Sequence, residues 1–239
     1  MSTTRGNIID RVVRILGDDS TEFRTFLEVS LNNMLFALWD AHDWSFKHKS
    51  GSFNTVSGTE AYNLAVTSTD IRSAQDVEVL YDSTNGRKII KVDLRDIRAR
   101  YPKEDTSGQP TIYAPWGATT IFLSDEPNGI FTLKYLYIST PTLPTADADV
   151  LATVCGLPAH TQYLLEKMVL AEGMLAYDDD RRQALLTEIS NVWLPTAVQA
   201  DMRHLESGAR FKFWEEELSA SGGSFDDFLR NTWSNSGYN

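Results

Sequence analysis

Apolar residues recur every three or four positions near the start of the chain, which is the spacing of one helical face. The first run lies in residues 6–16 and predicts a short amphipathic helix that ends at Gly17, a residue suited to a left-handed helix cap. A second, longer run begins after Asp19 and continues to about Trp44. Asp19 and Glu22 have the spacing of a capping box, so we expect the second helix to start there and to extend for roughly 36 Å.

From Trp44 onward the pattern changes to alternation with a period of two, which is typical of strands. The clearest strand pair is 77–82 and 87–92, joined across Asn85-Gly86, a dipeptide that favours a tight hairpin turn. Further strand candidates are 45–56, 62–64, 111–116, 119–124 and 130–139. Residues 45–140 are therefore expected to form a small antiparallel β module.

Helical spacing returns at Pro158, which suits the first turn of a helix. The run Asp178-Asp179-Asp180 then provides a cap for a further helix, in which Pro195 must cause a kink or a break. Helices, strands and helices again predict an α+β fold: a helical bundle of about four helices from residues 1–44 and 141–206, the inserted antiparallel β module of 45–140, and an extended C-terminal tail. The alternative is two independent domains in series, which would leave the first two helices without partners to bury their apolar faces.

The last 33 residues, 207–239, differ from the rest because 7 of them are aromatic. A Gly/Ser segment at 219–224 separates two aromatic groups and is typical of flexible spacers. Because a helix this short is marginal alone in water, we interpret the tail as a docking peptide that lies in a groove of another subunit. The alternatives are that it folds back on its own bundle or frays. The residues expected to dock on the partner are Phe211, Phe213, Trp214, Phe225, Phe228, Leu229 and Trp233.

The chain of 239 residues has 22 Lys and Arg against 33 Asp and Glu, a formal net charge of -11. This balance argues against a protein that grips phosphate backbones, which requires clustered basic residues. The charge is uneven: residues 1–44 carry -3, 45–140 are neutral, 141–206 carry -6 and 207–239 carry -2. The single cysteine, Cys155, excludes an internal disulfide framework. The absence of a long apolar run and of a signal-peptide pattern predicts a soluble protein, without a membrane partner, made in a reducing compartment.

No catalytic motif stands out. The glycine-rich nucleotide-binding motifs, the nucleophile elbow and the HExxH zinc motif are missing, and the 4 histidines are far apart. Asp147 and Asp149 suggest a calcium loop but lack its glycine and its closing glutamate. We therefore expect no catalytic residue, no metal site and no cofactor. The open enzymatic alternative is a glycoside hydrolase, which needs only two carboxylates beside a cleft. Its candidate carboxylates are Glu60, Glu166, Glu172 and Glu188.

Several short signatures follow one another in a recognisable order. A long helix ends in Trp44-x-Phe46, the β module contains Gly108-x-Pro110-x-x-Tyr113, and an Asp125-Glu126-Pro127 turn precedes the strand FTLKYLY. The sequence LPTADADVLATVCGLPAHTQYLLEKMVLAEG then occupies residues 143–173. In this order they resemble the head-to-tail adaptor (head completion, or connector) proteins of short-tailed bacteriophages, over residues 20–206. The aromatic tail is also similar to adaptors whose C-terminal segment reaches the portal.

The resemblance implies a structural protein of the virion and not an enzyme. Such adaptors are made in the host bacterial cytoplasm and assemble as a homo-oligomeric ring, typically of twelve, beneath the portal protein. They extend the DNA channel at the head–tail interface, serve tail assembly and genome ejection, and need no cofactor. The implied partners are further copies of the chain, the portal protein, a tail nozzle or tail fibre protein, and double-stranded DNA that passes without specific binding. Some adaptors have been credited with cell-wall hydrolase activity, so the hydrolase stays open, as does a cytosolic regulatory or binding module.

The uneven charge has a bearing on that role. If the acidic helical segments of residues 1–44 and 141–206 lined the lumen of a ring, they would repel the phosphates of a passing genome and let it slide.

Overall fold

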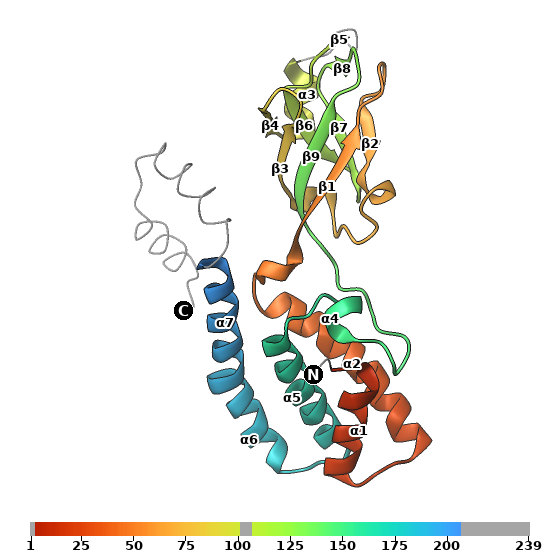
Figure 1. Cartoon of the computed structure of the whole chain (residues 1–239), viewed down its shortest axis with the longest axis vertical. Coiled ribbons are helices and arrows are strands. Elements are labelled where there is room, and N and C mark those ends of the chain that lie inside the picture. Colours follow the sequence, from red (N-terminus) through yellow and green to blue (C-terminus); the bar gives the residue numbers. More distant parts are fainter. Residues whose placement is uncertain (1–2, 101–106, 207–239) are drawn as a thin grey trace.

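The computed structural model describes residues 3–100 and 107–206. The fold is mixed α+β, with all the α-helices but one gathered at one end of an elongated molecule and the strands, together with the remaining α-helix (94–100), at the other (Figure 1). The α-helices are α1 (Arg5–Leu16), α2 (Thr21–Ala41), α3 (Leu94–Arg100), α4 (Leu151–Val154), α5 (Ala159–Ala176), α6 (Arg181–Glu188) and α7 (Leu194–Glu206). Short 3-10 turns are η1 (Ser45–Lys47), η2 (Leu64–Val66) and η3 (Ala74–Asp76), and η4 (Ile189–Trp193) is a π turn.

The main sheet has seven strands in the order β1-β9-β3-β4-β6-β7-β2. Its strands are β1 (His48–Asn54), β2 (Ala61–Asn63), β3 (Val77–Asp82), β4 (Arg87–Lys91), β6 (Ile112–Trp116), β7 (Thr120–Leu123) and β9 (Thr132–Ile138). A separate pair consists of β5 (Ser107–Gly108) and β8 (Glu126–Pro127).

The two N-terminal helices form where the apolar spacing predicts them, but the start of the second is not as expected. Gly17 adopts a φ of 78° and caps α1, which confirms its predicted role. The cap of α2 is Ser20, whose hydroxyl accepts the N–H of Phe23, so the predicted cap at Asp19 is wrong. A serine hydroxyl one residue later reaches the same free N–H groups of the first turn. The helix ends at Ala41, three residues before the predicted end.

Helix α5 lies at the centre of the helical end and packs against α1, α2, α6 and α7. Its residues are buried on more than one side, which agrees with a helix that has neighbours around it. The core that it shares with α1 and α2 includes the fully buried side chains of Ile8, Val12, Leu27, Leu31, Leu35, Leu165 and Val169.

The helical segment made of α6, η4 and α7 continues through Pro195 without a break. The π turn η4 comes immediately before α7, and Asn191, whose carbonyl would face the missing proline N–H, lies within that turn. Because proline removes one helical hydrogen bond and crowds the preceding turn, a locally wider π turn accommodates it without ending the helix.

The hairpin between β3 and β4 is confirmed, with Gly86 at a φ of 67° in the turn. The sheet as a whole is mixed, so the prediction of a purely antiparallel module is wrong. Strand β4 runs parallel to β6, and β5 runs parallel to β8. Parallel neighbours need a long crossover, and the connection from β4 to β6 supplies one that contains α3.

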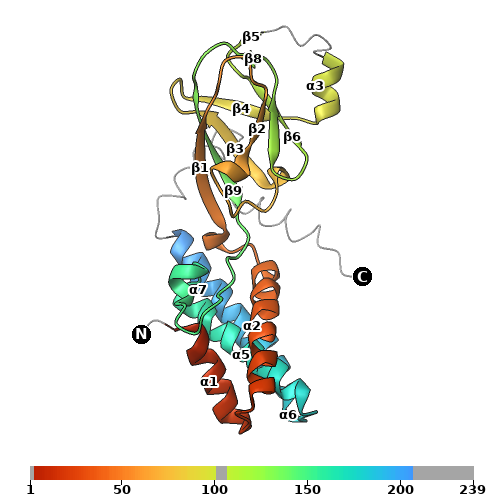
Figure 2. The same ribbon diagram turned by 90° about the vertical axis from the view of Figure 1, so that its right-hand side faces the viewer.

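The sheet curls, which brings its two edge strands toward each other (Figure 2). The rings of Phe53 on β1 and Tyr62 on β2 lie 4.9 Å apart between centroids. Inside the curl lies a second apolar core, which includes Leu80, Ile121 and Leu133. The first and last strands of the sheet in the sequence are neighbours in space, because His48 on β1 pairs with Ile138 on β9.

Candidate functional site

The seven tail residues expected to dock on a partner lie outside the described residues. They are Phe211, Phe213, Trp214, Phe225, Phe228, Leu229 and Trp233, all within 207–239. The candidate sites that follow are therefore drawn from the helical end, the sheet and the junction between them.

The junction joins α2, α7 and the first strand of the sheet through buried polar groups. Asp201 on α7 is fully buried and accepts the backbone N–H and the hydroxyl of Ser45, at 2.8 and 2.6 Å. The buried Lys47 ammonium donates to the carbonyls of Trp39 and His42 at the end of α2, at 3.0 and 3.1 Å. A cation at that position satisfies carbonyls that lack helical partners and complements the helix dipole.

His48, the first residue of β1, is held between two carboxylates. Its Nε2 lies 3.1 Å from Asp43 and its Nδ1 lies 3.2 Å from Glu78. Both ring nitrogens can donate only in the imidazolium form. Two hydrogen bonds raise the pKa of His48 to about 9, the one with Asp43 contributing most and the one with Glu78 next. Partial burial acts in the opposite direction. The junction therefore carries a histidine that is charged at neutral pH.

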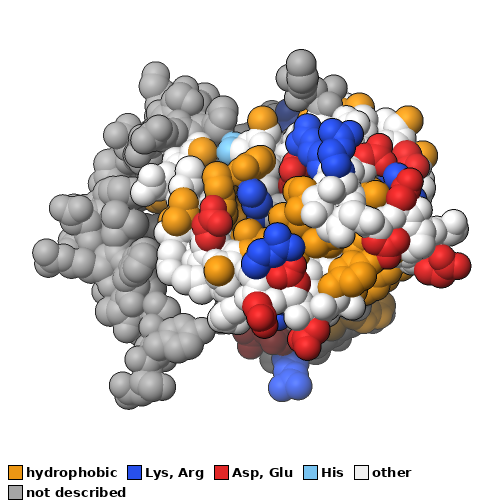
Figure 3. Space-filling model, turned by 90° about the horizontal axis from the view of Figure 1, so that it is seen from below, with side chains coloured by type: hydrophobic (Ala, Val, Ile, Leu, Met, Phe, Trp, Pro, Cys, Tyr) orange, Lys and Arg blue, Asp and Glu red, His pale blue; other side chains and the backbone are white. Residues whose placement is uncertain are grey.

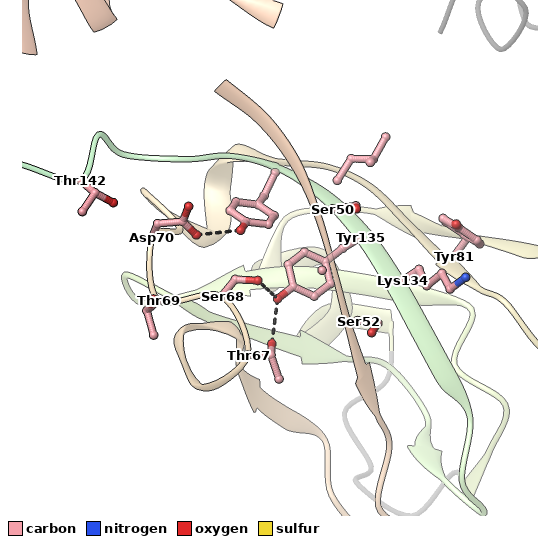
Figure 4. A pocket seen from close by; sticks show the side chains of 13 residues that line it. Ser50, Ser52, Thr67, Ser68, Thr69, Asp70, Tyr81, Lys134, Tyr135 and Thr142 are labelled. Carbon is pink, nitrogen blue, oxygen red and sulfur yellow. Dashed lines mark hydrogen bonds between the residues drawn. The ribbon is translucent and has the colours of Figure 1, made fainter. Parts of the chain in front are cut away.

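A polar cavity of about 670 Å³ opens beside β1 and β9 (Figure 4). Hydroxyl groups dominate its walls, with one lysine and one aspartate. The lining residues include Ser50, Ser52, Thr67, Ser68, Thr69, Asp70, Tyr81, Lys134, Tyr135, Tyr137 and Thr142.

Hydrogen bonds fix the tyrosines of this cavity. The buried Tyr135 hydroxyl lies 2.8 Å from the Thr67 hydroxyl and 2.7 Å from that of Ser68 (Figure 4). Tyr137 donates to Asp70 at 2.7 Å, and burial together with that carboxylate raises the pKa of Tyr137 to about 12. Burial opposes ionisation of Asp70, but its hydrogen bonds with Lys49 and Tyr137 lower the pKa of the carboxyl below its usual value.

The cavity is suited to hold a polar group by hydrogen bonds. Its hydroxyls are protonated at neutral pH and can donate or accept. No histidine or cysteine is among the lining side chains that the structure describes. The arrangement therefore offers polar contacts to a partner more readily than a nucleophile with a base.

The four carboxylates of the hydrolase alternative do not come together. Glu166 pairs with Arg11 at 2.7 Å, Glu172 with Arg182 at 3.6 Å, and Glu188 accepts the indole N–H of Trp193 at 2.8 Å. These three lie on helices. Glu60 lies in the strand-rich end instead, beside a cavity of about 420 Å³ that is also lined by Trp116 and Glu126.

The contacts of Cys155, and of Asp149 in the Asp147/Asp149 pair, indicate roles in the fold and not in catalysis or metal binding. Cys155 is 5% exposed, and burial, reinforced by Asp149, raises the pKa of its thiol to about 11. The Asp149 carboxylate accepts the N–H groups of Thr145 and Ala146 at 2.7 and 2.8 Å, as in a tight loop. Across residues 3–100 and 107–206, no group of three or more His, Cys, Asp or Glu side chains is arranged to hold a metal ion.

Among the described helices, none combines the length and the apolar character that a membrane span requires.

The sequence alone did not single out Asp201, Ser45 or the cavity residues. Each depends on contacts between positions far apart in the chain, such as the separation of 156 residues between Ser45 and Asp201. The one local signal was Gly51, a glycine within a strand, which often marks the close approach of another group.

Comparison with known proteins identifies no family for this chain. No protein-family model matches the chain, and no curated protein matches it.

Proposed function

We propose that the chain is the ring-forming head-to-tail adaptor of a short-tailed bacteriophage. In this proposal residues 1–44 and 141–206 form a helical bundle, and 45–140 form a β module inserted into it. The observation that supports it best is the pairing of β1 with β9, through which the chain enters and leaves the sheet at one place. A subunit with two ends and separate apolar cores suits a part that joins one structure to another.

Each part of the subunit has a role in the proposal. The tail docks on the portal, the helices build the ring, and the β module presents its polar cavity to a tail nozzle or tail fibre protein. The junction supports this division because Asp201, Lys47 and His48 fix the helices to the sheet. A rigid junction would hold the two binding ends at a constant orientation.

The excess of acidic residues fits the passage of DNA. Several carboxylates at the helical end are already neutralised by arginine, as with Glu28 on Arg5 at 2.6 Å and Asp19 on Arg24 at 2.5 Å. Those that form no ion pair among the described residues, such as the exposed Asp178, would set the local field of a channel wall. In an assembled ring we expect these carboxylates to face the lumen; their location on the outer rim would contradict this part of the proposal.

Portal binding by the tail tests the proposal directly. A chain ending at residue 206 should fold and remain in solution but fail to co-sediment with purified portal rings. In the full chain, replacing Phe225, Phe228 and Trp233 by alanine should weaken binding strongly, since buried aromatic anchors dominate interfaces. Alanine at Ser219 and Ser221, in the Gly/Ser segment, is the matched control. Unchanged portal affinity of the truncated chain would refute docking by the tail.

The hydrolase remains a second candidate because two carboxylates and an exposed tryptophan, 47% exposed, share the cavity beside Glu60. A tryptophan face beside carboxylates is a common arrangement for sugar binding. In this case Glu60→Gln or Glu126→Gln would abolish clearing of peptidoglycan in a zymogram, whereas Glu188→Gln would not. The third alternative, a cytosolic regulatory module, predicts a bound ligand and no affinity for the portal.

A further inference from the structure

Helix α2 presents an apolar strip to solvent in addition to its buried side. Phe26, Val29 and Phe36 are 38%, 56% and 45% exposed. Helices on a protein surface normally turn polar residues outward, so this strip is unusual for an uncovered helix. We define the α2 face as the exposed residues Thr25, Phe26, Val29, Asn33, Phe36 and Ala37.

A second exposed face lies on the opposite side of the helical end. We define the α7 face as Val192, Pro195, Thr196, Gln199 and Met202, which are exposed at helical spacing along η4 and α7. Beside Val192, the ring of Trp193 packs edge-on against Tyr163 with 4.7 Å between centroids. Tyr163 is itself 41% exposed, so an aromatic pair borders this face.

The two faces cannot cover each other within one chain. Helix α5 separates them, since it contacts both α2 and α7 (Figure 1). In Figure 1, α1 and α2 lie on one side of α5, with α6 and α7 on the other. Seen from below, hydrophobic side chains reach the surface of this end among the charged ones (Figure 3). Within residues 3–100 and 107–206, neither face is covered by another part of its own chain.

Both faces are poor in charge, which is how the centre of a protein interface differs from the remaining surface. Residues 25–37 contain one charged residue, Glu28, and residues 183–200 contain one, Glu188, in a chain that is 23% charged. Glu28 is paired with Arg5 in the same chain. Neither face therefore offers the dense charge that would keep a neighbour away.

The charges at the edges of the two faces are complementary. Glu22 and Asp40 extend the α2 strip at its two ends, and Asp40 is already paired with Arg72 at 3.2 Å. At the border of the α7 face, the Lys167 ammonium lies 5.2 Å from the Tyr163 ring centroid and 5.6 Å from that of Trp193. Within the part of the chain that the structure describes, neither Lys167 nor Glu22 forms an ion pair. The Lys167 cation on one face and the Glu22 carboxylate on the other favour contact between unlike faces over contact between two α2 faces.

We infer that the α2 face of one subunit binds the α7 face of a second copy of the same chain, head to tail. An interface between two different faces leaves one of each unused at the ends of a dimer, so further copies add until a ring closes. This inference rests on the proposed function in one respect, namely that the closed assembly is a ring; it adds the surfaces that form it.

Cysteine cross-linking of the full chain can test which faces meet. Val29→Cys places a thiol on the α2 face and Val192→Cys places one on the α7 face, at positions 56% and 49% exposed. A flexible bismaleimide then joins thiols that come close at high protein concentration. Cys155 is only 5% exposed, so the unmodified chain serves as the blank. The matched control carries Val66→Cys and Ile130→Cys, which are 78% and 77% exposed in the strand-rich end.

The double variant V29C/V192C should give a ladder of dimers, trimers and larger products, at about tenfold the yield of the control pair because the thiols are held at high effective concentration. The two single variants, when mixed, should stop at dimers, and each one alone should stay monomeric. Dimers from V29C alone or V192C alone would show a like-with-like interface and overturn the inference. Only monomers across the concentration range, or a ladder no stronger than the control, would overturn it too.

This experiment needs no portal, so it separates the two proposals. A ladder together with absent portal binding would retain the subunit interface and remove the adaptor role. Portal binding without a ladder would retain the adaptor role and remove the subunit interface.

Discussion

Asp201 on α7 accepts two hydrogen bonds from Ser45, one from its backbone N–H at 2.8 Å and one from its hydroxyl at 2.6 Å. Ser45 begins the turn η1 that leads from α2 into β1. The carboxylate therefore fixes the path of the chain at the point where it leaves the helices. Because Asp201 is fully buried, the contact is shielded from water and strongly dependent on both partners.

Removing this carboxylate should destabilise the protein. Asp201→Ala removes the acceptor of both hydrogen bonds from Ser45 in a partly buried contact, so we expect the free energy of unfolding to fall by about 1–3 kcal/mol. Asp201→Asn keeps one acceptor oxygen and should cost less. Urea unfolding followed by circular dichroism measures both. The control is Asp180→Ala, because Asp180 makes no side-chain cap bond, and its effect should stay within about 0.5 kcal/mol. Equal effects of the two alanine variants would contradict the assigned role.

Stability should fall as the pH rises through the range in which His48 loses its proton. The pKa of His48 is about 9 in the folded protein against 6.5 for an ordinary histidine, so its contribution is present in full below pH 6.5 and is lost as the pH rises through about 9. His48→Gln should remove this pH dependence, as measured by urea unfolding at pH 6, 7.5 and 9. His42→Gln, which alters a histidine without an ion pair among the described residues, is the control. A wild-type stability that stays flat over this range, or one that increases, would exclude a charged His48.

Gly51 should tolerate no larger residue. A Cβ at this strand position would overlap the ring of Tyr135, which crosses over the glycine. Gly51→Ala should therefore lower stability by about 1–3 kcal/mol, the usual cost of overpacking. Combining it with Tyr135→Leu should recover part of that cost, which a double-mutant cycle would reveal as a coupling. Gly129→Ala, at a site with open space around the added carbon, should be nearly neutral. Strict additivity of the two changes would show that the ring is not what excludes the side chain.

Cys155 should be unreactive in the native protein. Burial is the main reason that the pKa of its thiol is about 11, so very little thiolate exists at pH 8. Alkylation by iodoacetamide should be about two orders of magnitude slower than for an ordinary cysteine, as followed by intact mass. The urea-unfolded chain provides the reference rate. Native and unfolded chains that react equally fast would place the thiol at the surface.

The sequence predicted those elements whose signals are local. The apolar spacing of Ile8 and Val12, the glycine cap at Gly17 and the Asn85-Gly86 turn all lie within a few residues of what they determine, and the structure has the corresponding elements. The cap at Ser20 was missed because Asp18, Asp19 and Ser20 are all good capping residues, and only the geometry distinguishes them.

The remaining features depend on contacts across the chain. The parallel pairing of β4 with β6 follows from the course of the connection through α3, which no alternation of residues encodes. The cavity beside β1 combines residues 50–52, 67–70 and 134–137, and the Asp201–Ser45 contact joins positions 156 residues apart. Such sites arise from tertiary packing, which one sequence without its relatives does not specify.

The pairing of His48 with Ile138 also bears on how this protein can change over evolution. Paired residues on antiparallel strands have Cα atoms only about 5 Å apart, so a linker of a few residues could replace everything between them. A genome could thus exchange the whole segment from β1 to β9 for another by recombination at two adjacent points. The helices would keep their own packing, and a new surface would arrive in a single event.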